Sequence, residues 1–244
     1  MLGWFSNKQE ELITVPLNIL ETDIHSHFIA GIDDGAPDLA VAVSLIKKMS
    51  SLGYKKAITT PHVMSDFYQN SSEDIMEGLK MLQRELIKES VDFQIDAAAE
   101  YYIDFAFEQK IGKEKFLTFG DNYILVELSF IEPIKNLFNI IFKLQLEGYN
   151  VVLAHPERYN YYTLDDYKQL RSRGVFFQIN LLSLIGYYSS DIKLKTAKLI
   201  KEDLVSFAGS DCHNMHHAEL YKECEKEVLW HDLVKRGTLL NHTL

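Results

Sequence analysis

The sequence predicts an α/β fold in which seven parallel strands and the helices between them close into a barrel. Three observations predict it. The chain has 244 residues, close to the roughly 250 typical of a single α/β barrel domain. Short apolar strands follow amphipathic helices along the chain, as in a parallel sheet. Each predicted strand also ends in a polar residue. A barrel gathers such residues on one face, whereas an open doubly wound sheet collects them near one switch point.

The helices are predicted from apolar residues at helical spacing. The first follows Pro37, a residue suited to a first turn, and the third follows Pro133. The second lies among alternating charges. The three apolar stripes are Leu39, Val43, Ile46 and Met49; Ile75, Leu79, Leu82 and Leu86; and Ile134, Leu137, Ile141 and Leu144.

The strands are predicted from short apolar runs, several of which follow a glycine that suits a helix C-cap. In chain order these runs are NILETDIHSH, LGYKKAITTPH, FQIDAAAE, DNYILVELS, EGYNVVLAHPE, SRGVFFQIN and EDLVSFAGSDCH. No linker, low-complexity tract or composition break divides the chain. Residues 1–244 are therefore predicted to form a single domain.

The composition excludes several classes of protein. At 47% hydrophobic residues the chain can bury a full core, and its net charge of −10 argues against a nucleic-acid or anionic-membrane surface. Two cysteines provide no disulfide framework. The N-terminal stretch MLGWFSNKQEE does not resemble a signal peptide, and no apolar run approaches the ~20 residues needed to span a bilayer. We expect a cytoplasmic protein without membrane insertion.

His25 and His27 stand two apart on a predicted strand, so both side chains leave on one face, where Asp23 also points. Such a pair is typical of a metal site. The candidate ligands at the strand ends are His25, His27, Asp34, His62, Glu100, Glu127, His155, Asp211 and His213. This mixed nitrogen and oxygen set suits zinc, manganese or iron, and the absence of cysteine ligands disfavours a structural zinc. Because one ion cannot use nine ligands, two or three ions are expected.

A single strand-end histidine, or a single glutamate such as Glu100 or Glu127, is more often a satisfied polar residue than a ligand. Five or more strands that all end in His, Asp or Glu are hard to explain by packing alone. The joint pattern therefore favours a metal centre.

Charge indicates the substrate class. Four carboxylate ligands and three divalent ions would leave a pocket of about +2, which favours a dianionic phosphate ester. Arg158 follows His155 in AHPERY and would fork onto phosphate oxygens, or else form a surface ion pair with Glu157 or a neighbouring residue. A cysteine phosphatase needs Arg six residues after Cys, but Ala218 follows Cys212 there, and Trp230 follows Cys224. Both cysteines are predicted to be structural.

From Asp23 to His213 the motifs DIHSHFIAGIDDG, TTPH, AAAEYY, VELS, AHPERY and GSDCH resemble the polymerase-and-histidinol-phosphatase (PHP) superfamily in order and spacing. More closely, the chain is similar to the CpsB/YwqE type of manganese-dependent bacterial protein-tyrosine phosphatase. DIHSH…GIDDG together with AHPERY is specific, whereas GSDCH alone is weak. The resemblance implies a distorted seven-stranded (β/α)7 TIM-like barrel with a three-metal centre, most readily of Mn²⁺, with Fe, Zn or Mg as alternatives.

The resemblance also implies roles for individual residues. The first ion would be held by His25, His27, Glu100 and Asp211; the second by Glu100, Glu127 and His155; and the third by Asp34, His62 and His213. Arg158 would contact the phosphoryl group while a metal-bound hydroxide attacks phosphorus. Protonated His62 or His213 would assist the leaving phenolate. Asp34, His62, Arg158 and His213 are thus the expected catalytic residues.

The implied partner is a phosphotyrosine protein, namely the tyrosine-rich tail of a bacterial tyrosine kinase in capsule or exopolysaccharide regulation. One departure from the family stands out. Relatives often carry a second phosphate-clamping arginine where this chain has Ala218, and either His216 or His217 replaces it or the clamp is absent. Tyrosines in EYYID, PERYNYY and GYYSS would form an aromatic rim, or pack in the ordinary amphipathic way, which we favour.

Three alternatives remain. The same site would serve histidinol phosphate or another small phosphate ester. A metal-dependent amidohydrolase is disfavoured, because no lysine stands at the relevant strand ends to bridge two ions. A non-catalytic, metal-stabilised module that binds phosphotyrosine tails would retain the ligands without turnover.

Overall fold

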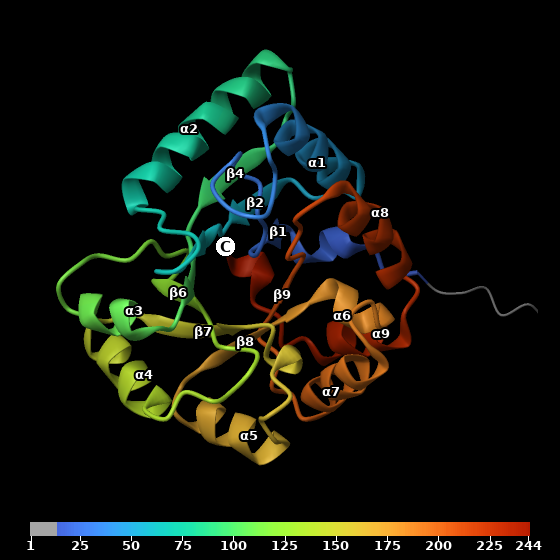
Figure 1. Ribbon diagram of the computed structural model, residues 1–244. Coiled ribbons are helices and arrows are strands. Elements are labelled where there is room, and N and C mark those ends of the chain that lie inside the picture. Colours follow the sequence, from blue (N-terminus) through green and yellow to red (C-terminus); the bar gives the residue numbers. More distant parts are fainter. Residues whose placement is uncertain (1–13) are drawn as a thin grey trace, which may run out of the picture.

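Parallel strands occupy the centre of the structure, a computed structural model that describes residues 14–244, and helices lie around them (Figure 1). The expectation for the N-terminal stretch MLGWFSNKQEE lies outside the described residues. The strands are β1 (Thr22–Asp23), β2 (Lys56–Thr59), β3 (His62–Val63), β4 (Gln94–Ala97), β5 (Glu100–Tyr102), β6 (Tyr123–Glu127), β7 (Asn150–Ala154), β8 (Phe176–Asn180) and β9 (Phe207–Gly209).

The strands pair side by side in parallel, as the alternation of strands and helices predicts. One sheet has the order β1-β2-β4 and the other the order β3-β5-β6-β7-β8-β9. Each predicted strand contains a strand of the structure, but two of them are interrupted. β2 and β3 are separated by Thr60 and Pro61, and Pro61 has no N–H for a ladder. β4 and β5 are separated by Ala98 and Ala99, although the amide of Ala98 still donates to Thr59 O at 2.9 Å.

The first strand is shorter than predicted and ends at Asp23. Beyond it, the chain from His25 to His27 runs beside the chain that follows β9. Ser26 and Cys212 form an isolated parallel bridge, the amide of His27 donates to Cys212 O (3.0 Å), and the amide of Asp211 donates to His25 O (2.7 Å). These contacts curl the sheet, so that its first and last strands approach each other. The seven-strand count of a closed barrel stays a prediction.

The helices are α1 (Leu39–Ser51), α2 (Ser72–Lys88), α3 (Phe105–Lys110), α4 (Leu137–Leu146), α5 (Leu164–Ser172), α6 (Leu181–Ile185), α7 (Ser190–Lys201), α8 (Met215–Cys224) and α9 (Val228–Arg236), with 3-10 turns η1 (Leu17–Leu20), η2 (Pro156–Arg158) and η3 (Asn241–Thr243). The first two predicted helices are α1 and α2. Ser71 caps α2, where its side chain and that of Asp74 bond each other's backbone amides. The third, α4, begins later than predicted. Ile134 lies before it, in a turn closed by Leu137 N and Ile134 O.

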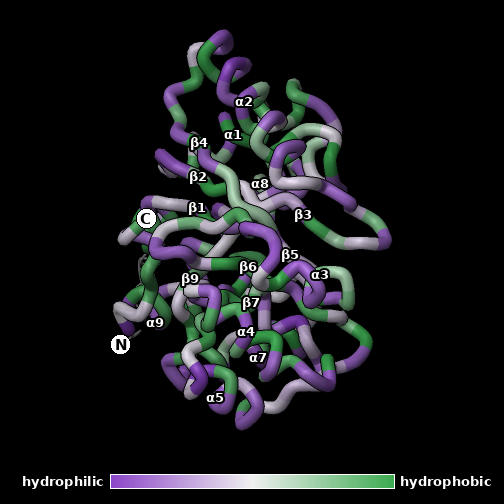
Figure 2. Tube along the Cα trace, turned by 90° about the vertical axis from the view of Figure 1, so that its left-hand side faces the viewer, coloured by the Kyte–Doolittle hydropathy of each residue, from purple (hydrophilic) through white to green (hydrophobic). Residues whose placement is uncertain are grey.

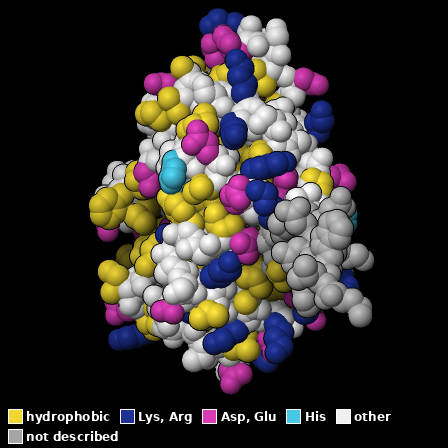
Figure 3. Space-filling model, turned by 90° about the vertical axis from the view of Figure 1, so that its right-hand side faces the viewer, with side chains coloured by type: hydrophobic (Ala, Val, Ile, Leu, Met, Phe, Trp, Pro, Cys, Tyr) yellow, Lys and Arg dark blue, Asp and Glu magenta, His cyan; other side chains and the backbone are white. Residues whose placement is uncertain are grey.

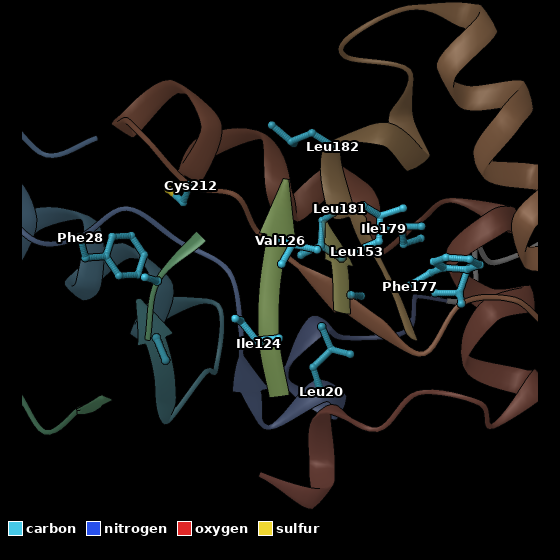
Figure 4. Close-up of a cluster of buried hydrophobic side chains, with 14 of the residues drawn as sticks. Leu20, Phe28, Ile124, Val126, Leu153, Phe177, Ile179, Leu181, Leu182 and Cys212 are labelled. Atoms are coloured by element: carbon cyan, nitrogen blue, oxygen red, sulfur yellow. The ribbon is translucent and has the colours of Figure 1, made fainter. Parts of the chain in front are cut away.

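Successive residues of each strand point to opposite faces, and this divides the core in two. On β6, Ile124 and Val126 pack outward in the larger cluster with the helices, part of which Figure 4 shows, whereas Leu125 packs inward. The inner cluster is Ile24, Ile58, Ala98, Phe119, Leu125, Val152, Ala154 and Phe207. Two residues beyond Leu125 on the inner face comes Glu127, and two residues beyond Ala98 comes Glu100. The alternation therefore aims these carboxylates at the carboxyl end of the sheet interior.

The other end of the interior is closed by η3. The side-chain amide of Asn241 accepts from Ala208 N (3.0 Å) and donates to Ala208 O (2.8 Å) and Thr22 O (3.0 Å). Leu240 and Leu244 pack against the inner cluster. The interior is thus apolar and sealed at one end and polar at the other.

The outside of the molecule carries charges of both signs. On the face in Figure 3, Lys and Arg side chains alternate with Asp and Glu side chains and with hydrophobic groups. In Figure 2 the trace is strongly hydrophobic at β6 and β7, in the centre, and hydrophilic along many outer loops. Among residues 14–244, no helix has the length and apolar character that a membrane crossing requires.

Candidate metal centre

All nine predicted ligand residues lie together at the carboxyl end of the sheet interior. They form four overlapping groups in which one ligand atom of each residue lies within 4.8 Å of the others. These groups are His27, Asp34, His62 and His213; His25, His27 and Glu100; His25, His155 and Asp211; and His62, Glu100 and Glu127. The structure thus brings together every residue of the predicted set.

The carboxylate of Glu100 lies at the centre of the cluster and is fully buried. Oε2 is 3.1 Å from His25 Nε2 and 3.1 Å from His62 Nδ1, and Oε1 is 3.0 Å from His155 Nε2. Burial alone would raise its pKa, but the imidazoles of His25 and His62 hold the pKa of Glu100 well below its usual range. A carboxylate shared by three strand ends suits a bridging ligand.

The tautomers of His25 and His27 follow from their outer partners. His25 Nδ1 lies 2.8 Å from Gln178 Oε1, and His27 Nδ1 lies 2.8 Å from Asp33 Oδ2. Both partners accept, so each ring donates from Nδ1 and turns the lone pair of Nε2 toward the cluster. Metal-ligating histidines are normally oriented by such partners.

The first group of donors has the spacing of a metal site. His25 Nε2 and His27 Nε2 face each other at 3.4 Å. Their distances to Asp211 Oδ1 are 3.5 and 3.3 Å, and those to Glu100 Oε2 are 3.1 and 3.6 Å. An ion with bonds of 2.0–2.2 Å holds adjacent ligand atoms about 2.8–3.6 Å apart. Facing ring nitrogens beside two buried carboxylates form a donor-rich site of negative charge, and the spacing fits a divalent cation.

A second set of donors lies on the other side of Glu100. His155 Nε2 is 3.6 Å from Glu127 Oε1, and His62 Nδ1 is 3.7 Å from Glu127 Oε2. Burial, together with the neighbouring charge of Glu100, raises the pKa of Glu127 well above its usual range. Burial lowers the pKa of His155 to about 4, which keeps this ring neutral and able to ligate. Two adjacent carboxylates and a neutral imidazole also fit a divalent ion.

The third set is more open to solvent. Asp34 Oδ1 lies 3.6 Å from His62 Nε2 and 3.4 Å from His213 Nε2, and the Asp34 side chain is 54% exposed. His213 Nδ1 lies 2.9 Å from the carbonyl of Asp211, which can only accept, so its Nε2 is free to ligate. An ion here would be the most accessible of the three.

Two of the candidate ligands have a backbone conformation that residues other than glycine rarely adopt. His155 has φ 32° and Asp211 has φ 53°, both in the left-handed region. Gly209, two residues before Asp211, allows a close approach. A Cβ there would lie 2.6 Å from His25 Cβ and 2.8 Å from Gln178 Nε2. The ligands are therefore placed by local backbone as well as by strand pairing.

Asp23 does not join the cluster, although the strand pattern points it to the same face as the two histidines. β1 ends at Asp23, and its carboxylate turns to Ser210, accepting from the backbone amide at 2.9 Å and from the hydroxyl at 2.6 Å. Burial raises its pKa to about 6. Through these two hydrogen bonds, Asp23 fixes the position of Ser210, the residue before Asp211.

Arg158 contacts two aromatic rings beside the cluster. Its guanidinium carbon is 4.4 Å from the ring centre of Phe130 and 4.8 Å from that of Tyr188, and Nη1 is 3.5 Å from Asp211 Oδ2. The alternative ion pair with Glu157 is not formed. Glu157 is buried and instead accepts from the amide of Asn180 (2.9 Å). The guanidinium is held at the site.

These side chains line a pocket of about 340 Å³. Six of the ligands line it (Asp34, His62, Glu127, His155, Asp211 and His213), together with Phe130, Arg158, Tyr188, Asn214 and His217. No lysine is among these residues. The pocket therefore has oxygen, imidazole and guanidinium groups on its walls and aromatic rings at its side.

The structure shows which histidine lies near the pocket in the segment where relatives carry the second arginine. Ala218 is buried, His216 is exposed and outside the pocket, and His217 lines the pocket. His217 Nδ1 accepts the His213 amide at 3.5 Å, which leaves Nε2–H as the donor of the ring. Of the two histidines, only His217 is in reach of a bound group.

Most tyrosines of the three tyrosine-rich loops pack in the ordinary amphipathic way that we favour. Tyr159 is fully buried, and Tyr161 and Tyr162 are half-buried. Tyr188 is the exception, because it lines the pocket and also accepts from Asn180 Nδ2 at 3.1 Å. Phe130 is a second pocket aromatic, and the sequence pattern does not single it out.

The sequence marked Asn180 only as the polar end of its strand, and it gave no role to the outer partners Gln178 and Asp33. Gln178 stands on the inner face of β8, two residues before Asn180, and Asn180 Nδ2 donates to Asp211 Oδ2 at 2.5 Å. Polar residues at alternate positions of an apolar strand are a signal that could have identified both. Asp33 has no such signal beside Asp34. Both cysteines are buried, with pKa raised by burial to about 12, as structural thiols.

Residues 21–230 match the family described as "Capsular polysaccharide synthesis, CpsB/CapC". The chain is 31% identical over 213 residues to tyrosine-protein phosphatase YwqE of Bacillus subtilis (strain 168), and 84% of each chain is covered. It is 25% identical over 216 residues to tyrosine-protein phosphatase CpsB of Streptococcus pneumoniae, covering 85% of this chain and 88% of the relative.

Solved structures agree with these matches. A chain from the crystal structures of B. subtilis YwqE and S. pneumoniae CpsB, described as unique metal-dependent tyrosine phosphatases, superposes with a TM-score of 0.75 at 29% identity, covering 88% of this chain and 91% of that one. Histidinol phosphate phosphatase from Lactococcus lactis superposes with a TM-score of 0.50 at 17% identity, covering 84% and 92%. The second likeness shows the fold alone.

Proposed function

Since the chain belongs to the CpsB/CapC family of capsular polysaccharide synthesis proteins, we propose that it is a metal-dependent protein-tyrosine phosphatase. The observation that carries the proposal is the convergence of nine imidazole and carboxylate side chains beside the aromatic-clamped Arg158. The named relatives are tyrosine-protein phosphatases, and one solved pair is described as metal-dependent. The substrate class follows from the pocket, which suits a phosphate ester.

The donor set supports two or three divalent ions. His25, His27, Glu100 and Asp211 would hold the first ion; Glu100, Glu127 and His155 the second; and Asp34, His62 and His213 the third. Mixed imidazole and carboxylate ligands suit manganese, iron or zinc; the resemblance to manganese-dependent phosphatases favours manganese among them, with magnesium as a further candidate. Bound divalent ions supply Lewis acidity, which activates water as a nucleophile and offsets charge on the phosphoryl oxygens.

The protein's own residues bind and orient the phosphoryl group. Arg158 donates two parallel N–H groups to its oxygens, and the rings of Phe130 and Tyr188 keep the guanidinium plane fixed. His217 provides a further donor from Nε2, in place of the arginine that the chain lacks at Ala218. The electrostatic contribution is large because the pocket is partly closed to water.

Proton transfer to the leaving phenolate oxygen falls to the open side of the site, to whichever ring of His62 and His213 does not hold an ion, because an imidazole that ligates through Nε2 and donates from Nδ1 has no proton to give. His62 and His213 both lie there, next to Asp34. A phenol with pKa ~10 is a tolerable leaving group, and a donor within hydrogen-bond reach improves it. The open side also admits the polypeptide that carries the phosphotyrosine.

The remaining parts of the proposal are broader. The two sheets act as one seven-stranded ring of a distorted TIM-like barrel, and residues 1–244 form a single domain. The physiological substrate is the phosphorylated tail of a bacterial tyrosine kinase that regulates capsule or exopolysaccharide synthesis, and the reaction takes place in the cytoplasm. The match to capsular polysaccharide synthesis proteins supports the proposed substrate, and the absence of a linker or composition break supports the single domain.

The test compares three substrates on manganese-loaded protein: a phosphotyrosyl peptide, p-nitrophenyl phosphate and histidinol phosphate. We expect turnover of the first two and a lower kcat/KM for the third. Arg158→Lys should lower kcat/KM by about 10²-fold. The matched control is Arg171→Lys, because Arg171 also stacks on an aromatic ring, that of Phe176, outside the pocket. No turnover of either phosphoaryl substrate with metal bound would refute the proposal, and preference for histidinol phosphate would replace the substrate.

A further inference from the structure

A cavity of about 990 Å³ opens beside the metal pocket, between the start of α2 and α3. One wall runs from Val63, the last residue of β3, to Glu73 in the first turn of α2, and the other is α3 with residues 114–117. Its base is formed by Tyr101 and Tyr102 of β5. Figure 1 shows α2 and α3 on either side of this region, and Figure 2 shows β3, β5 and α3 next to one another. We call this cavity the β5 groove.

The groove is a built feature with fixed walls. Asp104 joins them, because its carboxylate accepts from Ser65 N (3.2 Å) in one wall and from Phe107 N (2.7 Å) in the other. The hydroxyl of Tyr101 accepts from Leu117 N at 2.8 Å. Phe107 and Phe116 stack with ring centres 4.9 Å apart. These contacts hold the groove open without a ligand.

The groove begins where the metal pocket ends. Val63, in its wall, directly follows the ligand His62. Tyr102, at its base, lies two residues after Glu100 and is paired in the sheet with Glu127. A chain that places one side chain in the metal pocket therefore has its neighbouring residues at the mouth of the groove.

The chemistry of the groove suits an extended polypeptide. Val63, Met64, Phe116 and Leu117 offer apolar surface, while the first turn of α2 offers hydroxyl groups. Lys110 is paired with Glu114 at 3.4 Å, and Lys115 is exposed farther along. The groove has no concentrated positive charge for a small anion. It instead offers apolar contacts, the carboxylates of Glu73, Asp104 and Glu114, and two lysines, of which Lys110 is ion-paired with Glu114 and Lys115 is exposed.

We propose that the β5 groove binds the residues flanking the phosphotyrosine of a protein substrate, with a preference for apolar side chains and an acidic residue opposite Lys115. The inference rests on the proposed phosphatase activity and extends it, because it assigns sequence preference to a surface outside the metal pocket. A phosphotyrosine side chain alone would leave the groove empty. Peptide substrates therefore gain binding energy that small aryl phosphates do not.

The first experiment fills the groove. Ala106 lies on α3 in the groove wall, whereas Gln109 lies on the same helix and lines a different hollow. Ala106→Trp should lower kcat/KM for a phosphotyrosyl nonapeptide with apolar flanks by about tenfold or more, the value of one lost apolar contact. Its kcat/KM for p-nitrophenyl phosphate should stay within about twofold of wild type. Gln109→Trp should match wild type on both substrates.

The second experiment changes charge at the surface, where folding is not at risk. Lys115→Glu should lower kcat/KM for a peptide with acidic flanks by about threefold to tenfold, while Lys113→Glu, two residues away and outside the groove, should not. Peptides extended only before or only after the phosphotyrosine identify which flank binds.

The outcomes separate the two proposals. If metal-loaded wild type hydrolyses neither substrate, the phosphatase proposal fails. If wild type is active and Ala106→Trp leaves peptide turnover unchanged, or lowers both substrates equally, the groove assignment is overturned. It is also overturned if wild type shows no preference for the nonapeptide over free phosphotyrosine. Conversion of a wild-type dimer to a monomer by Ala106→Trp, measured by light scattering, would assign the groove to a second copy of the chain instead.

Discussion

Replacement of Gln178 by leucine tests whether outer contacts set the affinity of the metal centre. Gln178 Oε1 accepts from His25 Nδ1 at 2.8 Å and so keeps the Nε2 lone pair directed at the cluster. Leucine has a similar volume but no acceptor, so the His25 ring loses both its tautomer and its orientation. Losing such a partner typically lowers metal affinity by about 10–100-fold, or about 1.4–2.7 kcal/mol.

This loss can be read from thermal unfolding. A bound ion stabilises the folded state by an amount that grows with the logarithm of concentration over Kd, so at saturating manganese the increment falls by the same 1.4–2.7 kcal/mol or so. For a domain of this size, 1 kcal/mol shifts Tm by about 2–4 °C. The rise in Tm produced by manganese should therefore be smaller in Gln178→Leu than in wild type by about 3–11 °C.

The matched control is Asn241→Leu, which removes another buried amide that bridges strands, at the sealed end of the interior. It should lower the Tm of metal-free protein but leave the manganese increment unchanged. Calorimetric titration gives the change in Kd independently. An undiminished increment and Kd in Gln178→Leu would refute the reasoning that His25 is oriented through its outer contact.

Four further outcomes are expected. Dialysis against a chelator should abolish phosphatase activity and lower Tm, and added manganese should restore both; activity that survives complete metal removal would contradict the metal centre. Gly209→Ala, whose Cβ would lie 2.6 Å from His25 Cβ, should weaken manganese binding at least as much as Gln178→Leu, as titration would show. Ser71→Ala should cost about 1 kcal/mol of unfolding free energy in urea with turnover of p-nitrophenyl phosphate retained, because it removes a helix cap outside the metal pocket. Because burial raises the pKa of Cys212 and Cys224 to about 12, neither thiol should react with DTNB at pH 8 until the protein is unfolded, and iodoacetamide should leave turnover intact.

The elements that the sequence predicted well are those that rest on local patterns. The stripe from Ile75 to Leu86 is the buried face of α2, and the apolar run before Glu127 is β6. The alternation of side chains between the two faces of a strand also explains why the sequence identified so many ligands. A residue two positions beyond an inner apolar residue faces the same interior, so the polar strand ends had to converge once the sheet curled.

The parts that were missed depend on contacts between distant segments. Phe130 follows β6 and Tyr188 follows α6, and only the fold brings both rings into contact with Arg158. The sequence also cannot predict that Asp33, and not Asp34, pairs with His27, because the two aspartates are adjacent and chemically identical. The early end of β1 at Asp23 is a third case, because the bond to Ser210 spans most of the chain.

The left-handed backbone at His155 and Asp211 affects how the chain can evolve. Each non-glycine residue in such a conformation costs about 1 kcal/mol or more relative to glycine or asparagine, and these two positions are occupied by residues with ligand side chains. Selection for turnover keeps this cost in place, while selection for stability alone would remove it. In a homologue that has lost catalytic activity, we therefore expect glycine or asparagine to replace His155 and Asp211 early. Such substitutions would identify homologues that keep the fold but no longer catalyse the reaction.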